Sequence, residues 1–198
     1  MQRKSIVMST KKLKIGSSLP HFSLKGIDEK IYSSENFKDK KAIVVIFSCN
    51  HCPYVQAYES RIIKLQNNFV NDAAIVAINS NDAEKYPDDS FEMMKKRSDE
   101  KQFNFPYLHD EDQSVAKLFD ATHTPEVFLF DAERRLAFHG KIDDNWQTPD
   151  MVKSSYLRDA VVEVINGEEV SVPETFTIGC TIKWKKQCLL ANGGLATL

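Results

Sequence analysis

Residues 42–52 read AIVVIFSCNHC, and this stretch decides how the chain is expected to fold. The apolar, β-branched run at residues 42–47 predicts a short buried strand, because polar residues flank it on both sides. Residues 54–69 then carry apolar side chains at roughly helical spacing and predict a helix. Two thiols, Cys49 and Cys52, are therefore expected between the end of a strand and the start of a helix.

This placement of Cys49 and Cys52 favours thiol chemistry. The first N–H groups of a helix have no partner within the helix and carry a partial positive charge, which stabilises a thiolate. The thiolate is the reactive form of cysteine, so a lowered pKa activates such a site. In a cytosolic protein a CxxC pair is more often catalytic or metal-binding than structural.

Bulk composition predicts one compact domain without a nucleic-acid or membrane surface. The chain has 198 residues, of which 42% are hydrophobic, and its formal net charge is -2. No run of 18 apolar residues is present, so no membrane span is expected. The N-terminus lacks the apolar segment of a secretory signal, which predicts a cytoplasmic location, although a cleaved secreted form stays open. Four cysteines are too few for a disulfide scaffold in a chain of this size.

The rest of the chain alternates strands with helices. Further strands are expected at residues 22–24, 30–32, 73–78, 126–130 and 136–139, and further helices at 90–102, 114–119 and 156–165. Asp89 and Glu92 resemble a capping box at the start of the first of these helices. Such alternation predicts an α/β sheet with parallel strands, closed by an antiparallel hairpin. Residues 1–15 and 168–198 are expected to extend a domain at 16–167.

Four segments carry a resemblance to a known family: residues 16–24 (GSSLPHFSL), 47–53 (FSCNHCP), 105–110 (FPYLHD) and 124–131 (TPEVFLFD). In this order they resemble the redoxin branch of the thioredoxin superfamily. That branch includes the alkyl hydroperoxide reductase/thiol-specific antioxidant (AhpC/TSA) proteins and thioredoxin-like thiol–disulfide oxidoreductases. The resemblance implies a thioredoxin-like α/β fold, with helices flanking a central mixed sheet.

The resemblance also implies roles for individual residues. Cys49 matches the exposed nucleophilic cysteine of the family, and Cys52 matches the resolving cysteine. Pro125 matches the proline that is cis in this fold and lies against the CxxC. Cis X–Pro bonds are uncommon and are kept by tertiary context. In the family the extended backbone at this position, here Thr124 and Pro125, pairs with incoming substrate.

The chain departs from the family pattern at four positions. Ser48 precedes the first cysteine where thioredoxin has Trp, and Pro53 follows the second. Glu126 follows Pro125, where Thr is usual. Ile46 stands three residues before Cys49, where a peroxiredoxin has a Thr that helps to bind peroxide, so an efficient direct peroxidase is disfavoured.

Two polar residues near the thiols in the sequence or the expected fold are candidates for catalytic roles. A charged His51 would stabilise the Cys49 thiolate and raise the reduction potential above the thioredoxin end of a range from about -270 to about -120 mV. The alternative for His51 is an exposed side chain without a role. Glu126 could exchange a proton with the thiols, with its pKa raised by partial burial. Its alternative is an outward-pointing residue at the start of a strand.

Cys180 lies in the segment IGCTIKW, residues 178–184, which is also found in some redoxin-family chains. As an accessory thiol it would exchange with the CxxC or pair with Cys188. Seven residues separate these two cysteines, which permits a loop disulfide without implying one.

The remaining candidates are weaker. Asp143 and Asp144 are expected to be loop and capping residues, or else a polar rim of the site. His109, His123 and His139 are potential metal ligands, although scattered histidines of this kind are mostly ordinary surface or core residues.

The leading interpretation is a thiol–disulfide oxidoreductase in which Cys49 attacks a disulfide and Cys52 resolves the mixed disulfide. Its partners would be a disulfide-containing protein or small molecule and a thiol electron donor, and it would need no cofactor. We expect a monomer or weak dimer. The alternatives are a thiol peroxidase of the alkyl hydroperoxide reductase type, a Cu(I) or zinc module built from the CxxC and a histidine, and a redox-inert interaction domain.

Overall fold

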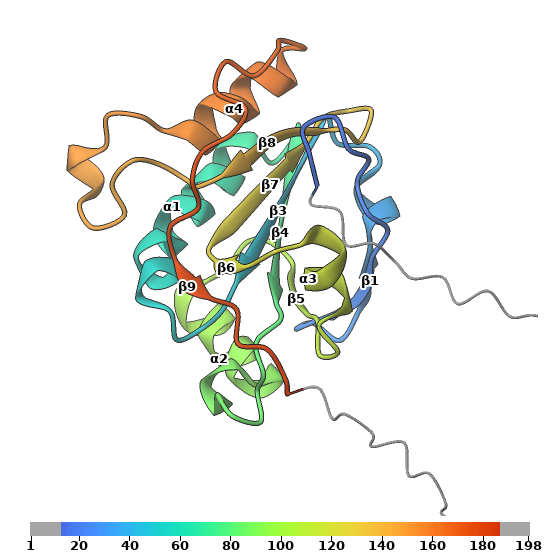
Figure 1. Cartoon of the computed structure of the whole chain (residues 1–198), viewed down its shortest axis with the longest axis vertical. Helices are drawn as coiled ribbons and strands as arrows, with labels where there is room; N and C mark the ends of the chain where they lie inside the picture. Colours follow the sequence, from blue (N-terminus) through green and yellow to red (C-terminus); the bar gives the residue numbers. More distant parts are fainter. Residues whose placement is uncertain (1–12, 187–198) are drawn as a thin grey trace, which may run out of the picture.

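A seven-stranded mixed sheet forms the centre of the computed structural model, which describes residues 13–186 (Figure 1). Its strands are β1 (Ser23–Gly26), β2 (Ile31–Ser33), β3 (Ala42–Ser48), β4 (Ala73–Asn79), β5 (Tyr107–His109), β7 (Glu126–Phe130) and β8 (Leu136–Gly140). They follow the order β2-β1-β5-β4-β3-β7-β8. The pairs β3–β4 and β4–β5 are parallel, and the other pairs are antiparallel. The expected α/β fold with a mixed sheet is confirmed.

Helices cover both faces of the sheet. The four α-helices are α1 (Pro53–Phe69), α2 (Phe91–Lys101), α3 (Ser114–Phe119) and α4 (Tyr156–Ile165). Strand β3 is buried along its whole length, and its side chains alternate between two cores. Val44 and Ile46 pack with α1 and α4, whereas Val45 and Phe47 pack with α3. Burial on both faces explains why this strand is apolar throughout, rather than alternating with polar residues.

The register of β3 and β4 places the CxxC beside a polar loop. The two parallel strands pair from Ala42 with Ala73 to Ser48 with Asn79. Residues 49–52 and 79–82 therefore leave the sheet at the same carboxyl edge. In open α/β sheets this edge is where ligands bind.

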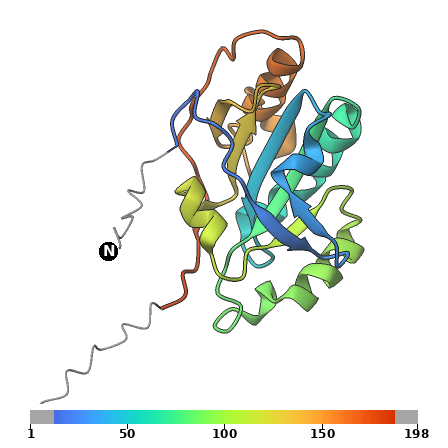
Figure 2. The ribbon, with the colours of Figure 1, turned by 90° about the vertical axis from the view of Figure 1, so that its right-hand side faces the viewer.

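The C-terminal part of the described chain crosses this edge. Residues 175–185, called the strap below, run past the N-terminal end of α1 and pair with residues beside the CxxC (Figures 1 and 2). A two-stranded sheet joins β6 (His123–Thr124) to β9 (Cys180–Thr181). Residues 168–186 therefore pack on the domain, although the sequence shows no period there.

The strap is held at both ends. At its start, Thr175 N–H donates to the His139 carbonyl oxygen at 3.0 Å, and Lys141 N–H donates to Thr175 Oγ1 at 2.9 Å. At its far end, Lys183 N–H donates to Asn81 Oδ1 at 2.8 Å. Ile182 is buried in the core on the α3 side of the sheet. Hydrogen bonds and a buried apolar side chain thus fix the strap across the site.

Glycine is found at two close approaches between the strap and the rest of the domain: Gly140 beside Thr175, and Gly179 beside Thr124. A Cβ atom at Gly140 would lie 2.0 Å from Thr175 Oγ1, and one at Gly179 would lie 2.3 Å from the carbonyl oxygen of Thr124. Only glycine allows backbones to approach this closely.

Most elements lie where the sequence predicts them. One correction concerns the start of α2, because its N-cap is Ser90. Asp89 belongs to a preceding 3-10 helix (Pro87–Asp89), and its carboxylate binds the CxxC loop instead of capping α2. The sequence analysis missed β5, β6 and β9, which have only two or three residues. Within residues 13–186, none of the helices has the length and apolar character needed to cross a bilayer.

Candidate thiol site

The two thiols lie where the sequence placed them, but neither is exposed. Cys49 directly follows β3, and Cys52 is the N-cap of α1, with Pro53 at the first helical position. Pro is tolerated there because its missing N–H has no role in the first turn. Cys49 is 2% exposed and Cys52 0%. The implied exposure of Cys49 was therefore wrong: both thiols form a small apolar cluster with Val55, against which Tyr54 and Cys180 pack.

Thr124, the residue before Pro125, contacts both cysteines of the CxxC. The Thr124–Pro125 peptide bond is cis, which confirms the expectation for Pro125. The hydroxyl of Thr124 lies 3.3 Å from Cys49 Sγ, and Cys52 Sγ lies 3.2 Å from the Thr124 carbonyl oxygen. The register pairs Thr124 with Cys180, so the strap lies along the backbone that receives substrate in related proteins.

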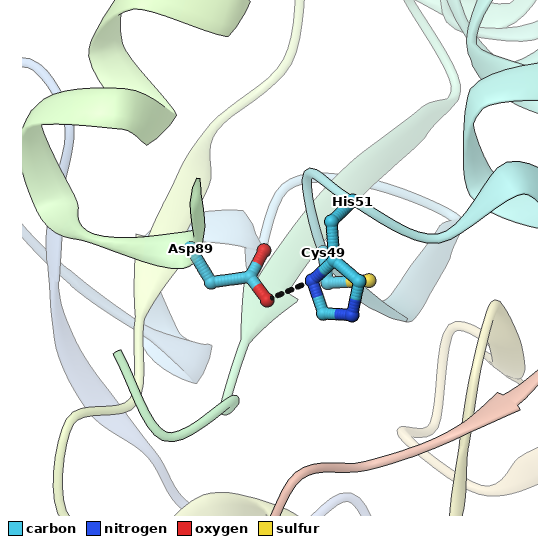
Figure 3. Close-up of side chains that lie close together, drawn as sticks. All are labelled: Cys49, His51 and Asp89. Carbon is cyan, nitrogen blue, oxygen red and sulfur yellow. Dashed lines mark hydrogen bonds and ion pairs between the residues drawn. The ribbon is translucent and has the colours of Figure 1, made fainter. Parts of the chain in front are cut away.

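His51 is bound to a carboxylate that the sequence analysis had assigned to a helix cap. Nδ1 of His51 lies 2.6 Å from Oδ2 of Asp89, and Figure 3 shows these side chains converging with Cys49. Asp89 is fully buried, whereas 25% of the His51 side chain is exposed. The imidazole also stacks on Tyr86 at a centroid distance of 5.5 Å.

Asn50 fixes the shape of the loop between the cysteines. Its backbone N–H donates to Asp89 Oδ1 at 2.6 Å, and its side-chain amide donates to the carbonyl oxygen of Asp88 at 2.6 Å. Its side-chain oxygen accepts a hydrogen bond from the buried Tyr107 hydroxyl at 3.0 Å, and its carbonyl accepts one from Gln56 at 2.8 Å. The loop is thus tied to three other segments of the chain.

Asp89 and Tyr107 belong to the candidate site, and sequence reasoning missed both. A usable signal was the polar run at residues 79–82, which starts at the last residue of β4 at the same sheet edge as the CxxC. Asn81 of this run donates to Asp89 Oδ2 at 2.7 Å.

The pKa values of the two thiols are shifted in opposite directions. Its pKa is lowered to about 4 by the hydrogen bond from Cys49, and further by the Cys180 thiol and the backbone N–H of Val55. The same hydrogen bond raises the pKa of Cys49, and burial and the negative charge of Asp89 add to this. The stabilisation of a Cys49 thiolate by a charged His51 stays a prediction, and the Asp89 carboxylate bound to the imidazole acts on Cys49 in the opposite direction.

Glu126 does not contact the thiols, and its expected role as a proton carrier finds no geometric support. It is 3% exposed, so the outward-pointing alternative is also wrong. Burial acts to raise the pKa of Glu126, but hydrogen bonds from His139, Thr122 N–H and His123 N–H outweigh it and lower the pKa. The expected upward shift was therefore wrong. Glu126 joins β8 to the turn before the cis proline, through His139 Nε2 at 2.8 Å and Thr122 N–H at 2.7 Å.

The side chains around Cys49 also include potential metal ligands. Among residues 13–186, one group of three potential ligand side chains comes together: Cys49, His51 and Asp89, with ligand atoms within 4.8 Å of one another. Both carboxylate oxygens of Asp89 already accept hydrogen bonds from the protein. This cluster includes neither His109, His123 nor His139.

The two aspartates after β8 form separate contacts. Asp143 is 5% exposed and accepts hydrogen bonds from Arg61 and from Tyr58, the latter at 2.7 Å. Asp144 accepts the backbone N–H of Lys153 at 3.0 Å. They are structural residues, as the sequence analysis favoured, and not a polar rim.

Cys180 reaches the CxxC directly. Its Sγ lies 2.9 Å from Cys52 Sγ, although the two residues are 128 positions apart in sequence. Cys180 is partly exposed, unlike the other two thiols. Cys188, the other partner suggested by the sequence, lies outside the described residues.

Comparisons with known proteins agree with this fold. The model of the AhpC/TSA family matches residues 15–139. An uncharacterised conserved protein of Geobacillus kaustophilus shares 38% identity at a TM-score of 0.83, covering 87% of this chain and 93% of its own. No curated protein matches the chain.

Two more distant structures share the fold. The thioredoxin domain of a thiol-disulfide oxidoreductase of Bacteroides vulgatus is 19% identical, with a TM-score of 0.56, and covers 65% of this chain and 89% of its own. A peroxidoxin of Mycobacterium tuberculosis is 18% identical, with a TM-score of 0.55, and the match covers 78% of this chain and 95% of the peroxidoxin chain. Together with the family match, these findings point to thiol oxidoreductases and peroxidases in general. The chain belongs to the AhpC/TSA family, within the redoxin branch of the thioredoxin superfamily.

Proposed function

We propose that this protein is a thiol–disulfide oxidoreductase that cycles Cys49 and Cys52 between dithiol and disulfide. The observation that carries the proposal is the convergence of both thiols on Thr124, the residue before the cis proline, at the N-terminus of α1. Cys49 and Cys52 belong to one small apolar cluster and so lie near each other, as disulfide formation requires.

The order of steps follows the roles that the family resemblance implied, with Cys49 as the attacking thiol and Cys52 as the resolving thiol. In the resting dithiol, Cys52 is the thiolate and Cys49 donates its proton to it. Transfer of that proton to Cys52 frees Cys49 to attack one sulfur of a substrate disulfide, and the other sulfur leaves as a thiolate. Cys52 gives this proton to the departing substrate thiolate, and the Cys52 thiolate then attacks Cys49 in the mixed disulfide. The second substrate thiolate leaves, and the substrate has gained two electrons.

A polar pocket beside His51 suggests where a small substrate would lie. It has a volume of about 330 Å³, and its lining includes Asn50, His51, Gln56 and Lys96. The rest of the lining is Met93, Arg97, Asp88 and Glu100, so the pocket holds two basic and two acidic side chains beside its hydrogen-bonding groups. A small disulfide with polar groups of both charges therefore fits this pocket better than an apolar one.

The test is a redox titration of metal-free protein in glutathione buffers of varied ratio, followed by alkylation and peptide mass spectrometry. We expect a reversible Cys49–Cys52 disulfide with one defined midpoint. Cys52→Ser should retain a mixed disulfide between Cys49 and glutathione, because the resolving thiol is lost. A Cys49–Cys52 pair that stays reduced throughout the series would overturn the proposal.

A thiol peroxidase is the second candidate, because the AhpC/TSA match includes the CxxC region. Against it, Ile46 is a fully buried core residue where related peroxidases place a threonine. Fast loss of the Cys49 thiol with hydrogen peroxide, and no response to glutathione disulfide, would favour this candidate. Stoichiometric metal in protein purified without chelator would instead favour a metal-binding module.

A further inference from the structure

We propose that Cys180 is a third redox-active thiol. It displaces Cys49 from the Cys49–Cys52 disulfide, and the resulting Cys52–Cys180 disulfide is accessible from the protein surface. The inference rests on the proposed function, because it needs an oxidised CxxC as its starting point. The observation behind it is the contact between Cys52 Sγ and Cys180 Sγ at 2.9 Å. A disulfide bond measures about 2.05 Å, so a movement of less than about 1 Å would join the two sulfurs.

The strap holds Cys180 at this place by its backbone. Cys180 pairs with Thr124, and the next residue but one, Ile182, is buried and donates its N–H to the Thr122 carbonyl oxygen at 2.9 Å. The backbone N–H of Cys180 also binds the sulfur of Cys52. The contact between the thiols thus follows from strand pairing, and does not depend on the rotamer of one side chain alone.

Access distinguishes the three thiols. Cys49 and Cys52 are 2% and 0% exposed, and the strap lies across them. Cys180 is partly exposed. Thiol exchange requires access of the attacking thiolate to a sulfur atom, so an external donor reaches Cys180 more readily than either buried cysteine.

The exchange step is balanced without any further reactant. The Cys180 thiolate attacks Cys52 Sγ of the Cys49–Cys52 disulfide, the old S–S bond breaks, and its electron pair leaves on Cys49. A new Cys52–Cys180 disulfide forms, and the protein is neither oxidised nor reduced overall. A donor thiolate then attacks Cys180, and Cys52 leaves as a thiolate. A second donor thiol releases Cys180 and becomes oxidised with the first.

Electrostatics favour this order. In the reduced protein the pKa of Cys180 is raised to about 11, by burial first and then by the hydrogen bond and negative charge of Cys52. Oxidation of Cys52 removes its negative charge, while the positive charge of Lys183, which lowers this pKa, remains. Cys180 is therefore activated when the CxxC becomes oxidised. Cys52 is also a good leaving group, because thiols of low pKa leave faster.

The experiment uses the full chain with Cys188→Ser, so that three thiols remain. Cys49→Ser and Cys49→Ala each leave only Cys52 and Cys180, and Cys180→Ser leaves the CxxC pair. All are equilibrated in glutathione buffers and mapped by alkylation and mass spectrometry. We expect both Cys49 variants to form an intramolecular Cys52–Cys180 disulfide with a defined midpoint. The oxidised Cys180→Ser protein should be reduced by glutathione more slowly, on the order of tenfold, because its disulfide is buried.

The outcomes separate this inference from the proposed function. If folded Cys49 variants form no internal disulfide across the series, the inference is overturned, whatever the CxxC does. An equal rate of glutathione reduction with and without Cys180 also overturns it. If Cys180→Ser protein fails to form a Cys49–Cys52 disulfide, the proposed function itself fails.

Discussion

His51 and Asp89 form a pair in which Nδ1 of the imidazole lies 2.6 Å from a fully buried carboxylate oxygen. The same carboxylate holds the backbone N–H of Asn50. Asp89 thus fixes the conformation of the CxxC loop. Its negative charge also raises the pKa of Cys49.

Replacement of Asp89 separates these two effects. In Asp89→Asn, the pKa of Cys49 should fall because a nearby negative charge is removed, so Cys49 should be alkylated at lower pH. Stability should fall by about 1–3 kcal/mol, because charged hydrogen bonds to buried groups are lost. The measurement is the pH profile of Cys49 alkylation, with urea unfolding. Asp88→Asn, an exposed neighbour, is the matched control. A Cys49 pKa unchanged by Asp89→Asn would contradict this account of its cause.

Reduced protein should contain one thiolate at neutral pH, on Cys52. Its ultraviolet absorbance should titrate with a midpoint near a pH of about 4 and disappear in Cys52→Ser. Cys49→Ser should raise the midpoint, because the largest cause of the low pKa is the hydrogen bond from Cys49. Cys180→Ser should raise it less. A thiolate signal that survives Cys52→Ser at neutral pH would show that the charge resides elsewhere.

Glu126→Gln should affect stability and not thiol reactivity. Its carboxylate bonds His139 and two backbone N–H groups, so a loss of about 1–3 kcal/mol is expected at neutral pH. Because folding lowers the pKa of Glu126, its contribution is present above the unfolded value of about 4.3 and is lost as pH falls through the folded value.

The stability gap between wild type and Glu126→Gln should therefore narrow in acid. Urea unfolding at several pH values measures this gap, and Glu133→Gln, at an exposed position, is the control. Alkylation of the cysteines should keep its pH profile in Glu126→Gln. A flattened pH profile of cysteine alkylation would show that Glu126 takes part in the thiol chemistry.

Gly179→Ala should loosen the strap over the thiols. The new Cβ would lie 2.3 Å from the Thr124 carbonyl oxygen, so the two backbones must separate. We expect faster alkylation of Cys49, whose burial depends on this covering segment. Thr181→Ala, at an exposed position of the same strap, should leave the rate unchanged. Equal rates in both variants would mean that something other than the strap protects Cys49.

Arg61→Met should be strongly destabilising although it lies away from the thiols. Arg61 pairs with Asp143, whose side chain is only 5% exposed. Breaking a buried pair leaves a charge without compensation and costs about 3–5 kcal/mol. Arg158→Met removes an exposed pair with Asp159 and should cost no more than about 1 kcal/mol. Urea unfolding of the two variants compares them directly, and similar losses would contradict the assigned role of burial.

The fold could be predicted from the sequence because its long elements have a strong pattern. The apolar run of β3 and the helical spacing of α1 show in a continuous stretch of sequence which side chains are buried, whatever element they pack against. The β6–β9 pair could not be predicted, because two-residue strands have no period and depend on a contact between distant segments.

The site was predicted as far as residue identity and order along the chain allow. Cys49, Cys52 and Pro125 were found because motif spacing marks them. The contacts of Cys49 and Cys52 with Thr124 and Cys180, and the part played by Asp89, span 38 or more positions, which no local pattern records.

The contact between Cys52 and Cys180 also has a topological consequence. A bond there would close most of the domain into a covalent ring, because 128 positions separate the two residues. Closing a loop of about 100 residues restricts the unfolded chain enough to add about 4.7 kcal/mol of stability in the chain-entropy model. The melting temperature should then depend on the oxidation state of Cys180, and it should be higher for protein with the Cys52–Cys180 disulfide than for reduced protein.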